Sequence, residues 1–339
     1  MNRRTFLTAL GLGSATIVVS CASDDDASPD GSERATVASS TSVPDVSTPA
    51  SPLTTDPFGV GVASGDPTPT SVILWTRLIT ELTAPVDVKW EVAADRSFSR
   101  PVASGIVTAA PEWAHSLHLD ATGLDPDTEY WYRSSSAAFT SAIGRARTTP
   151  EPDASPKQLR LGFASCQDYQ WGTYVLWKHA AAEKPDAVVF LGDYIYELSL
   201  GDLSPAQDGS RVWASPPPTD LATYRARYAQ TKSDHHLQAA HAAAPWIITF
   251  DDHEVANNYA GDVGQGDVDQ PRSRDRRLAA YQAFYEHQPI RVTPEPDSFE
   301  SLELQRSLHF GTLADLAVIE TRQYADAPAC RTDASLISD

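Results

Sequence analysis

The fold is decided by the segment 160–197, which contains Arg160-Leu-Gly-Phe-Ala-Ser-Cys166 and Asp186-Ala-Val-Val-Phe-Leu-Gly-Asp193-Tyr194-Ile-Tyr196-Glu197. Each stretch is a short apolar run that ends in polar residues, and a helix-like segment separates the two. This pattern predicts a β-α-β unit. Because the loops beyond the carboxyl ends of parallel strands form the site in such units, Cys166 and Asp193 should face one crevice. Together with the phenol of Tyr196, they predict a metal site.

A third apolar run, Trp246-Ile-Ile-Thr-Phe250, leads directly into Asp251-Asp252-His253-Glu254 and Asn257-Asn258. Dinuclear hydrolases hold two cations about 3.5–4 Å apart, bridged by a carboxylate, with a water placed for attack on phosphorus. Here Asp193 would bridge, Asp252 or Asn257 would bind the second ion, and His253 would donate a hydrogen bond to phosphate. Alternatively, the acidic residues form a solvated loop and His253 caps a helix. Two polar clusters at matching strand ends argue against this alternative.

Length and charge narrow the class of protein. The 339 residues suffice for two domains, and 41% hydrophobic residues are typical of a globular protein. The net charge of -19 argues against nucleic acid as a partner and predicts no nucleic-acid-binding domain. An acidic protein that acts on an anionic substrate needs bound cations, which again favours metals in the site.

Residues 1–21 predict export. Asn2-Arg3-Arg4-Thr5-Phe6-Leu7 is a twin-arginine pattern, and the apolar run 8–20 is too short to span a membrane as a mature helix. Val18-Val19-Ser20-Cys21 resembles a lipobox, so we expect a lipoprotein signal. An ordinary secretion signal with an incidental Cys21 is the alternative. The predicted partners are the twin-arginine translocase and, through a lipid anchor, the outer side of the cytoplasmic membrane; secretion is the other localisation.

The three cysteines lie in different contexts. Cys21 belongs to the signal, Cys166 follows a predicted strand, and Cys330 lies in a polar segment without an assigned role. A Cys166–Cys330 disulfide is possible in an oxidising compartment. The position of Cys166 in a βα loop favours a functional role instead.

Residues 22–55 are rich in Ser, Thr, Asp, Pro and Ala and predict a disordered linker. Residues 56–149 predict an antiparallel β-sandwich, because short alternating runs recur between turn signals. The segment Leu124–Tyr132 resembles the closing loop and strand of a fibronectin-type domain, and Ser64-Gly65-Asp66-Pro67 suggests packing against the neighbouring domain. The predicted strands are 60–64, 71–77, 86–92, 114–119 and 129–133.

Residues 157–339 predict the second domain, in which strands and helices alternate. Besides the runs above, helices are expected around 174–181 and at 219–233, 234–243 and 271–287, and a strand pair at 302–310 and 313–322. His235, His236 and His241 have no spaced partner, so they are expected to be surface or satisfied groups rather than ligands.

The set of motifs resembles the PhoD-like alkaline phosphatases. The segments that carry the resemblance are Ser165-Cys166-Gln167, 191–197, 251–255 with Asn257-Asn258, and 315–324, with 58–67 and 73–77 in the N-terminal half. It spans about residues 56–325. The resemblance implies a fibronectin-like β-sandwich followed by a metallophosphoesterase-type αββα domain. It also implies a metal-dependent alkaline phosphatase and phosphodiesterase, exported by the twin-arginine route, that hydrolyses phosphate mono- and diesters.

The resemblance further implies ferric iron, Fe(III), and calcium, Ca(II). Cys166, Asp193 and Tyr196 resemble the iron ligands, Asp193 also reaches calcium, and Asn257 resembles a calcium ligand. Phenolate and carboxylate suit Fe(III), whereas amide and carboxylate oxygens suit Ca²⁺. The expected catalytic residues are His253, Asp252 and Arg291, the last as a phosphate clamp for which Arg276 and Arg277 compete.

One departure from the family pattern affects function. The family continues to a Gly-Asp-x-His element, and no Gly-Asp of this chain is followed by x-His. The metallophosphoesterase domain is therefore expected to be its N-terminal portion only, with weak metal retention and little or no turnover. The alternative function is a lipid-anchored β-sandwich binding module with a non-catalytic α/β remnant. An iron–zinc phosphatase of the purple acid type is disfavoured, because His-x-His motifs are absent.

Overall fold

The computed structural model describes residues 53–198, 211–261, 272–292, 294 and 298–326, and the backbone of residues 19–20. The predicted signal, most of the predicted linker, and Cys330 lie outside these residues. In the part of the chain that is described, no helix combines the length and the apolar character needed to cross a bilayer.

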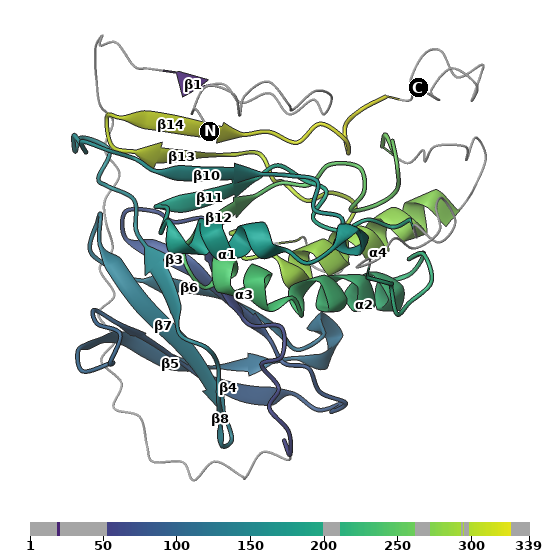
Figure 1. The fold of residues 1–339 in the computed structure, drawn as a ribbon, viewed down its shortest axis with the longest axis horizontal. Coiled ribbons are helices and arrows are strands. Elements are labelled where there is room, and N and C mark those ends of the chain that lie inside the picture. Colours follow the sequence, from purple (N-terminus) through teal and green to yellow (C-terminus); the bar gives the residue numbers. More distant parts are fainter. Residues whose placement is uncertain are drawn as a thin grey trace.

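The N-terminal part is a β-sandwich, as predicted (Figure 1). Its hydrophobic core includes Val72, Leu74, Val92, Tyr130 and Tyr132. Ile73 and Trp75 are buried as well, so the segment 71–76 is covered on both faces. One sheet contains β2 (Val62–Gly65), β3 (Ser71–Arg77) and β6 (Ser116–Thr122), and the other contains β4 (Val86–Ala93), β5 (Pro101–Ala109), β7 (Glu129–Ser136), β8 (Phe139–Thr140) and β9 (Gly144–Arg147). A 3₁₀ turn, η2, covers Pro111–Trp113.

The second part is built on three parallel strands, β10 (Leu161–Ala164), β11 (Ala187–Phe190) and β12 (Pro245–Ile248). Val188 and Phe190 face the helices, whereas Ala187 and Val189 face β13 and β14, so both faces of β11 are buried. The remaining elements are η3 (Tyr169–Trp171), α1 (Val175–Ala182), α2 (Leu221–Lys232), α3 (His235–His241), α4 (Arg272–His287), β13 (Arg306–Phe310) and β14 (Ala314–Val318); the backbone of β1 (Val19–Ser20) pairs with β14.

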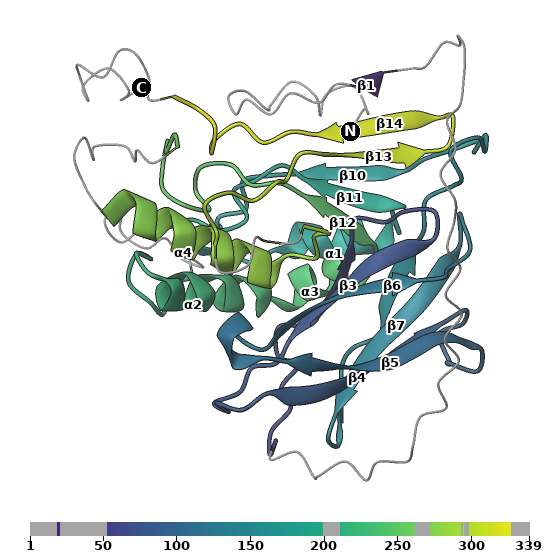
Figure 2. The same cartoon turned by 180° about the vertical axis from the view of Figure 1, so that it is seen from behind.

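The two parts share one sheet, a feature that the sequence did not predict. Strand β12 pairs in parallel with β2, so the sheet order is β10-β11-β12-β2-β3-β6 (Figure 2). Gly65 lies where the chain leaves this pairing, and a Cβ there would lie 2.0 Å from the carbonyl oxygen of Pro289. Glycine is therefore required at this close approach.

Asp66 fastens the sandwich to the second part. Its carboxylate is 3% exposed and accepts hydrogen bonds from Arg306 Nη2 at 2.8 Å and from the Arg291 backbone N–H at 2.8 Å. The Arg291 guanidinium donates to the Asp66 carbonyl at 3.0 Å and to Asp120 Oδ2 at 2.5 Å. The prediction that residues 64–67 pack against the neighbouring domain is confirmed.

Buried histidines lie where the helices meet the sandwich. His287 donates from Nδ1 to the Ala283 carbonyl at 2.6 Å and accepts at Nε2 from Arg77 of β3 at 2.6 Å, so it is held as the neutral tautomer. Burial, reinforced by Arg77, holds the pKa of His287 well below its usual 6.5. His241 is likewise buried, and its Nε2 is hydrogen-bonded to Tyr194. Its Nδ1 has no partner among the described residues, so the prediction of a satisfied group holds for one ring nitrogen only.

The interface should therefore be acid-labile. The unfolded chain takes up a proton on His287 below pH 6.5 and the folded chain does not, so stability is complete above pH 6.5 and falls as the pH decreases. His287→Gln has no proton to take up. Its free energy of unfolding should fall less steeply below pH 6.5, by about 1.4 kcal/mol per pH unit. Denaturant unfolding between pH 8 and pH 5 measures both slopes, and equal slopes would contradict a neutral buried His287.

Candidate metal centre

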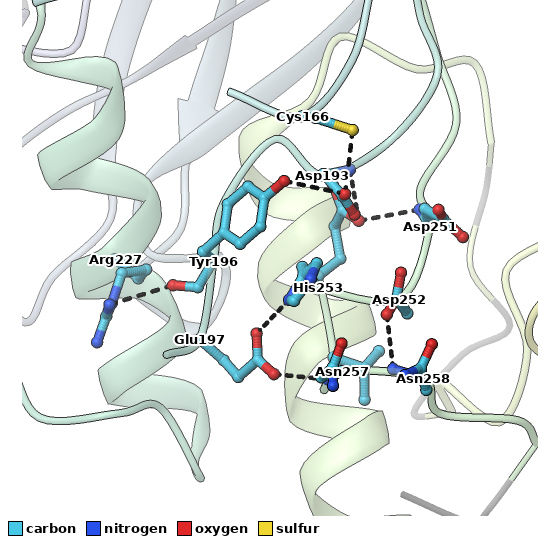
Figure 3. A network of polar contacts seen from close by, with 12 residues as sticks. Cys166, Asp193, Tyr196, Glu197, Arg227, Asp251, Asp252, His253, Asn257 and Asn258 are labelled. Carbon is cyan, nitrogen blue, oxygen red and sulfur yellow. Dashed lines mark hydrogen bonds and ion pairs between the residues drawn. The ribbon is translucent and has the colours of Figure 1, made fainter. Parts of the chain in front are cut away.

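The loops after β10, β11 and β12 meet at the carboxyl edge of the sheet (Figure 3). Backbone hydrogen bonds join the first two, from Cys166 N–H to the Gly192 carbonyl at 3.1 Å and from Gln167 N–H to the Asp193 carbonyl at 3.0 Å. Cys166 and Asp193 have φ angles of 57° and 58°, in the left-handed region that is costly for residues with a Cβ. Strain of this kind persists where neighbouring contacts enforce it and is concentrated at functional sites.

Asp193 is the centre of the cluster (Figure 3). Its Oδ2 accepts hydrogen bonds from Cys166 Sγ at 3.3 Å and from the Tyr196 hydroxyl at 3.1 Å. The residue is 6% exposed, and among the described residues no donor reaches its buried Oδ1. A buried carboxylate oxygen without a donor is costly, and a cation would relieve that cost. Thiol, carboxylate and phenol therefore converge in a way that fits a metal ion.

Asp252 and His253 face Asp193 from the loop after β12. One ligand atom from each of the three residues lies within 4.8 Å of the others. Asp252 accepts from Asn258 N–H at 2.6 Å and from Arg322 Nη2 at 3.2 Å, which fixes its orientation. Asn257 lies beside them, with its backbone N–H bound to Glu197 at 2.5 Å.

The protonation of the cluster follows from its burial. Burial raises the pKa of Asp193, and the neighbouring Asp252 carboxylate raises it further. Burial likewise raises the pKa of Cys166 to about 11 and, with the Asp193 charge, that of the Tyr196 phenol. For His253, burial lowers the pKa, but the hydrogen bond to Glu197 and the negative charges of Glu197, Asp193 and Asp252 together outweigh burial and raise the pKa to about 9. Metal ligands must be deprotonated, so binding a cation here would release protons.

Comparison with known proteins identifies the family. The model of the PhoD-like phosphatase family matches residues 161–338, and that of the PhoD-like phosphatase N-terminal domain matches residues 43–150. The chain belongs to the PhoD-like phosphatase family. It is 44% identical over 280 residues to alkaline phosphatase D of Bacillus subtilis, covering 80% of this chain and 48% of that protein.

A solved structure, titled "Structure of PhoD", matches the fold with a TM-score of 0.78 at 42% identity, over 83% of this chain and 55% of that one. The chain thus spans about half the length of the relatives that it matches. The mixed fold of an N-terminal all-β domain and an α/β domain is confirmed.

In this member of the PhoD-like family, the structure brings together most of the predicted site residues. Cys166, Asp193 and Tyr196 share hydrogen bonds, and Asp252 and His253 lie opposite. The alternative of a solvated acidic loop is wrong for two of its residues, because Asp252 and Glu254 are 5% and 1% exposed. Both carboxylates are hydrogen-bonded, Asp252 to Asn258 and Arg322 and Glu254 to backbone N–H groups.

Arg291 is a correction. We expected a phosphate clamp, but its guanidinium is bound to Asp66 and Asp120 at the contact with the sandwich. The competing arginines are also engaged elsewhere, Arg276 with the Tyr224 hydroxyl at 2.8 Å and Arg277 with Glu300. Two other arginines do reach the cluster. Arg322 donates to Asp251 at 2.6 Å and to Asp252, and Arg227 donates to the backbone carbonyl of Tyr196 at 3.1 Å (Figure 3).

Sequence reasoning gave no role to Glu197, Glu254 or Arg322, although all lie in the quoted motifs. Glu197 accepts from His253 Nδ1 at 2.7 Å, and Glu254 accepts from three backbone N–H groups. The sequence did contain a sign that the two glutamates belong to the site, because each lies within seven residues of the end of a buried strand.

Gly192 should be indispensable for this arrangement. Its φ is 111°, and a Cβ would lie 2.4 Å from the backbone nitrogen of Asp251, so Gly192→Ala must separate the loops after β11 and β12. We expect at least a tenfold loss of metal affinity, in keeping with misplaced ligands. Gly162→Ala is the control, since its Cβ meets Val188 at an ordinary 3.7 Å. Isothermal titration with Ca²⁺ compares them, and equal affinities would contradict the role of this contact.

Proposed function

We propose that this chain forms part of a metal-dependent phosphatase that hydrolyses phosphate mono- and diesters by attack of water on phosphorus. The observation that carries the proposal is Asp193, whose Oδ2 receives both the Cys166 thiol and the Tyr196 hydroxyl while its Oδ1 is buried without a described donor. Membership of the PhoD-like family supports the same reaction class. The alternative of an inert remnant accounts for neither the burial nor the convergence of these groups.

The donor set fits ferric iron and calcium. Cys166, Tyr196 and Asp193 would hold Fe(III), because thiolate, phenolate and carboxylate are the anionic donors that stabilise it. Asp193, Asp252 and Asn257 would offer oxygens to Ca²⁺. When bound, the two cations would supply Lewis-acid activation of water and of the phosphate oxygens.

The side chains of this chain then divide the remaining work. The Asp193 carboxylate would help to hold both cations, since Cys166 and Tyr196 contact its Oδ2 and its Oδ1 is buried without a described donor. His253 is held by Glu197 with a raised pKa, so its imidazolium can donate a hydrogen bond to a phosphate oxygen. As the P–O bond to the water oxygen forms, the ester P–O bond breaks and the alcohol leaves with the proton that the water loses. The His253 donor stabilises the negative charge on the phosphoryl group during this exchange.

Asp193→Ala tests this function. It removes the bridging carboxylate, so iron and calcium content, measured by elemental analysis after reconstitution, should fall to background. Phosphate release from a chromogenic monoester and diester should fall with it. Asp87→Ala, at an exposed carboxylate on β4, should retain the content of unaltered protein. Metal retained by Asp193→Ala would contradict the assignment.

We also propose export by the twin-arginine translocase and anchoring through Cys21, on the support of Arg3-Arg4 and of the lipobox-like Val18–Cys21. Replacing both arginines by lysine should keep the protein in the cytoplasm, because the translocase requires the pair. Cys21→Ala should move the protein from the membrane fraction to the soluble fraction. Fractionation and immunoblotting check both, and unchanged membrane association of Cys21→Ala would contradict the anchor.

A further inference from the structure

Two buried glutamates, one from the loop after β11 and one from the loop after β12, each accept hydrogen bonds from the other loop. Figure 3 shows the first, Glu197, beside His253 and Asn257. Glu197 leaves the first loop and accepts hydrogen bonds from the second, whereas Glu254 leaves the second and accepts from the first. We propose that Glu197 and Glu254 are positioning residues, a reciprocal clasp that sets the metal ligands in their binding geometry before any cation arrives. The metal half of this inference rests on the proposed function.

Glu254 binds backbone rather than ligands. Its Oε2 accepts from the N–H groups of Asp193 at 3.1 Å and Asp251 at 2.9 Å, and its Oε1 accepts from Tyr194 N–H at 2.6 Å. Asp193 and Tyr194 lie in the loop after β11 and Asp251 lies in the loop after β12; none of the three N–H groups has a partner in a sheet, and buried N–H groups must be satisfied. The carboxylate thereby stabilises the left-handed backbone of Asp193 and joins it to the start of the neighbouring loop.

Glu197 extends from the loop after β11 and binds groups of the loop after β12. It is 3% exposed, and it accepts from His253 Nδ1 at 2.7 Å and from Asn257 N–H at 2.5 Å. The bond at Nδ1 fixes the orientation of the imidazole ring. Nε2 is then the ring nitrogen that can donate to a phosphate oxygen. Tyr196 adds a packing restraint, with its ring centroid 4.2 Å from that of His253.

The reciprocity has an energetic consequence. Each loop contains the acceptor that the donors of the other loop require, so neither loop reaches its conformation unless both do. The clasp therefore couples Asp193 of one loop to Asp252 and His253 of the other, which is what a site shared by two loops needs. It does so without metal, because every contact is between protein groups.

The variants Glu254→Gln and Glu197→Gln keep the shape of each side chain and replace one acceptor oxygen by an NH₂ group. An NH₂ group cannot accept, so each change leaves a backbone N–H or the His253 N–H without its acceptor. Glu286→Gln is a matched control. Glu286 is equally buried, but its carboxylate binds Arg225 and Gln282, away from both loops.

Hydrogen–deuterium exchange of the metal-free, full chain tests the clasp directly. In Glu254→Gln, amides of both 190–197 and 250–258 should exchange about tenfold faster, since an orphaned buried donor destabilises the turn. Glu286→Gln should leave both segments unchanged, even if it lowers the melting temperature. Acceleration confined to 250–258, or equal acceleration in Glu286→Gln, would overturn the clasp. If Glu254→Gln does not fold, Glu197→Gln provides the same test from the other loop.

Metal binding tests the positioning role. Equilibrium dialysis with Ca²⁺ and with Fe(III) should show affinities about tenfold to a hundredfold weaker in either loop variant, as for other residues that orient ligands. Glu286→Gln should lie within about threefold of unaltered protein, since it touches neither loop. Unchanged affinity in both loop variants would overturn the positioning role. If unaltered protein binds neither cation, the proposed function fails, and the exchange experiment then decides the clasp alone.

Discussion

The structure depends on one close contact, between Gly192 and the backbone of Asp251. There is room for a hydrogen atom but not for a methyl group, since a Cβ would lie 2.4 Å from the Asp251 nitrogen. This contact sets the separation of the loops after β11 and β12. Everything in the cluster follows from that separation, because Asp193 belongs to one loop and Asp252 and His253 belong to the other.

The β-sandwich contributes to the same rigidity. Because β2 continues the sheet beyond β12, the strand that ends at the cluster is paired on both sides, with β11 and with β2. Asp66, at the end of β2, is in turn bound by Arg306 of β13 and by Arg291. The sandwich is thus part of the scaffold that holds the site, and not an independent module beside it.

The sequence was informative where local pattern and chemistry coincide. The strands β10, β11 and β12 and the residues at their carboxyl ends were predictable, because the apolar runs end in polar residues that include Cys166, Asp193 and Asp251, as a buried strand does where it enters a polar loop. Pairing of β12 with β2 was not predictable, since residues 64 and 245 are joined by no local signal. The strand β5 was missed because Pro101–Ala109 is rich in small residues and mostly exposed. Arg291 was wrongly predicted to bind phosphate, because a guanidinium group binds a protein carboxylate as readily as a phosphate and the sequence does not distinguish the two.

The account therefore rests on buried negative charge gathered by two loops, with Asp193 at its centre. X-ray diffraction from iron-loaded crystals of the chain, with anomalous data collected at the iron edge, tests this most directly. We predict an anomalous peak within bonding distance of the Asp193 carboxylate, Cys166 Sγ and the Tyr196 hydroxyl oxygen. Iron bound elsewhere, with Asp193 still hydrogen-bonded to Cys166 and Tyr196, would contradict the assignment of these three residues as metal ligands.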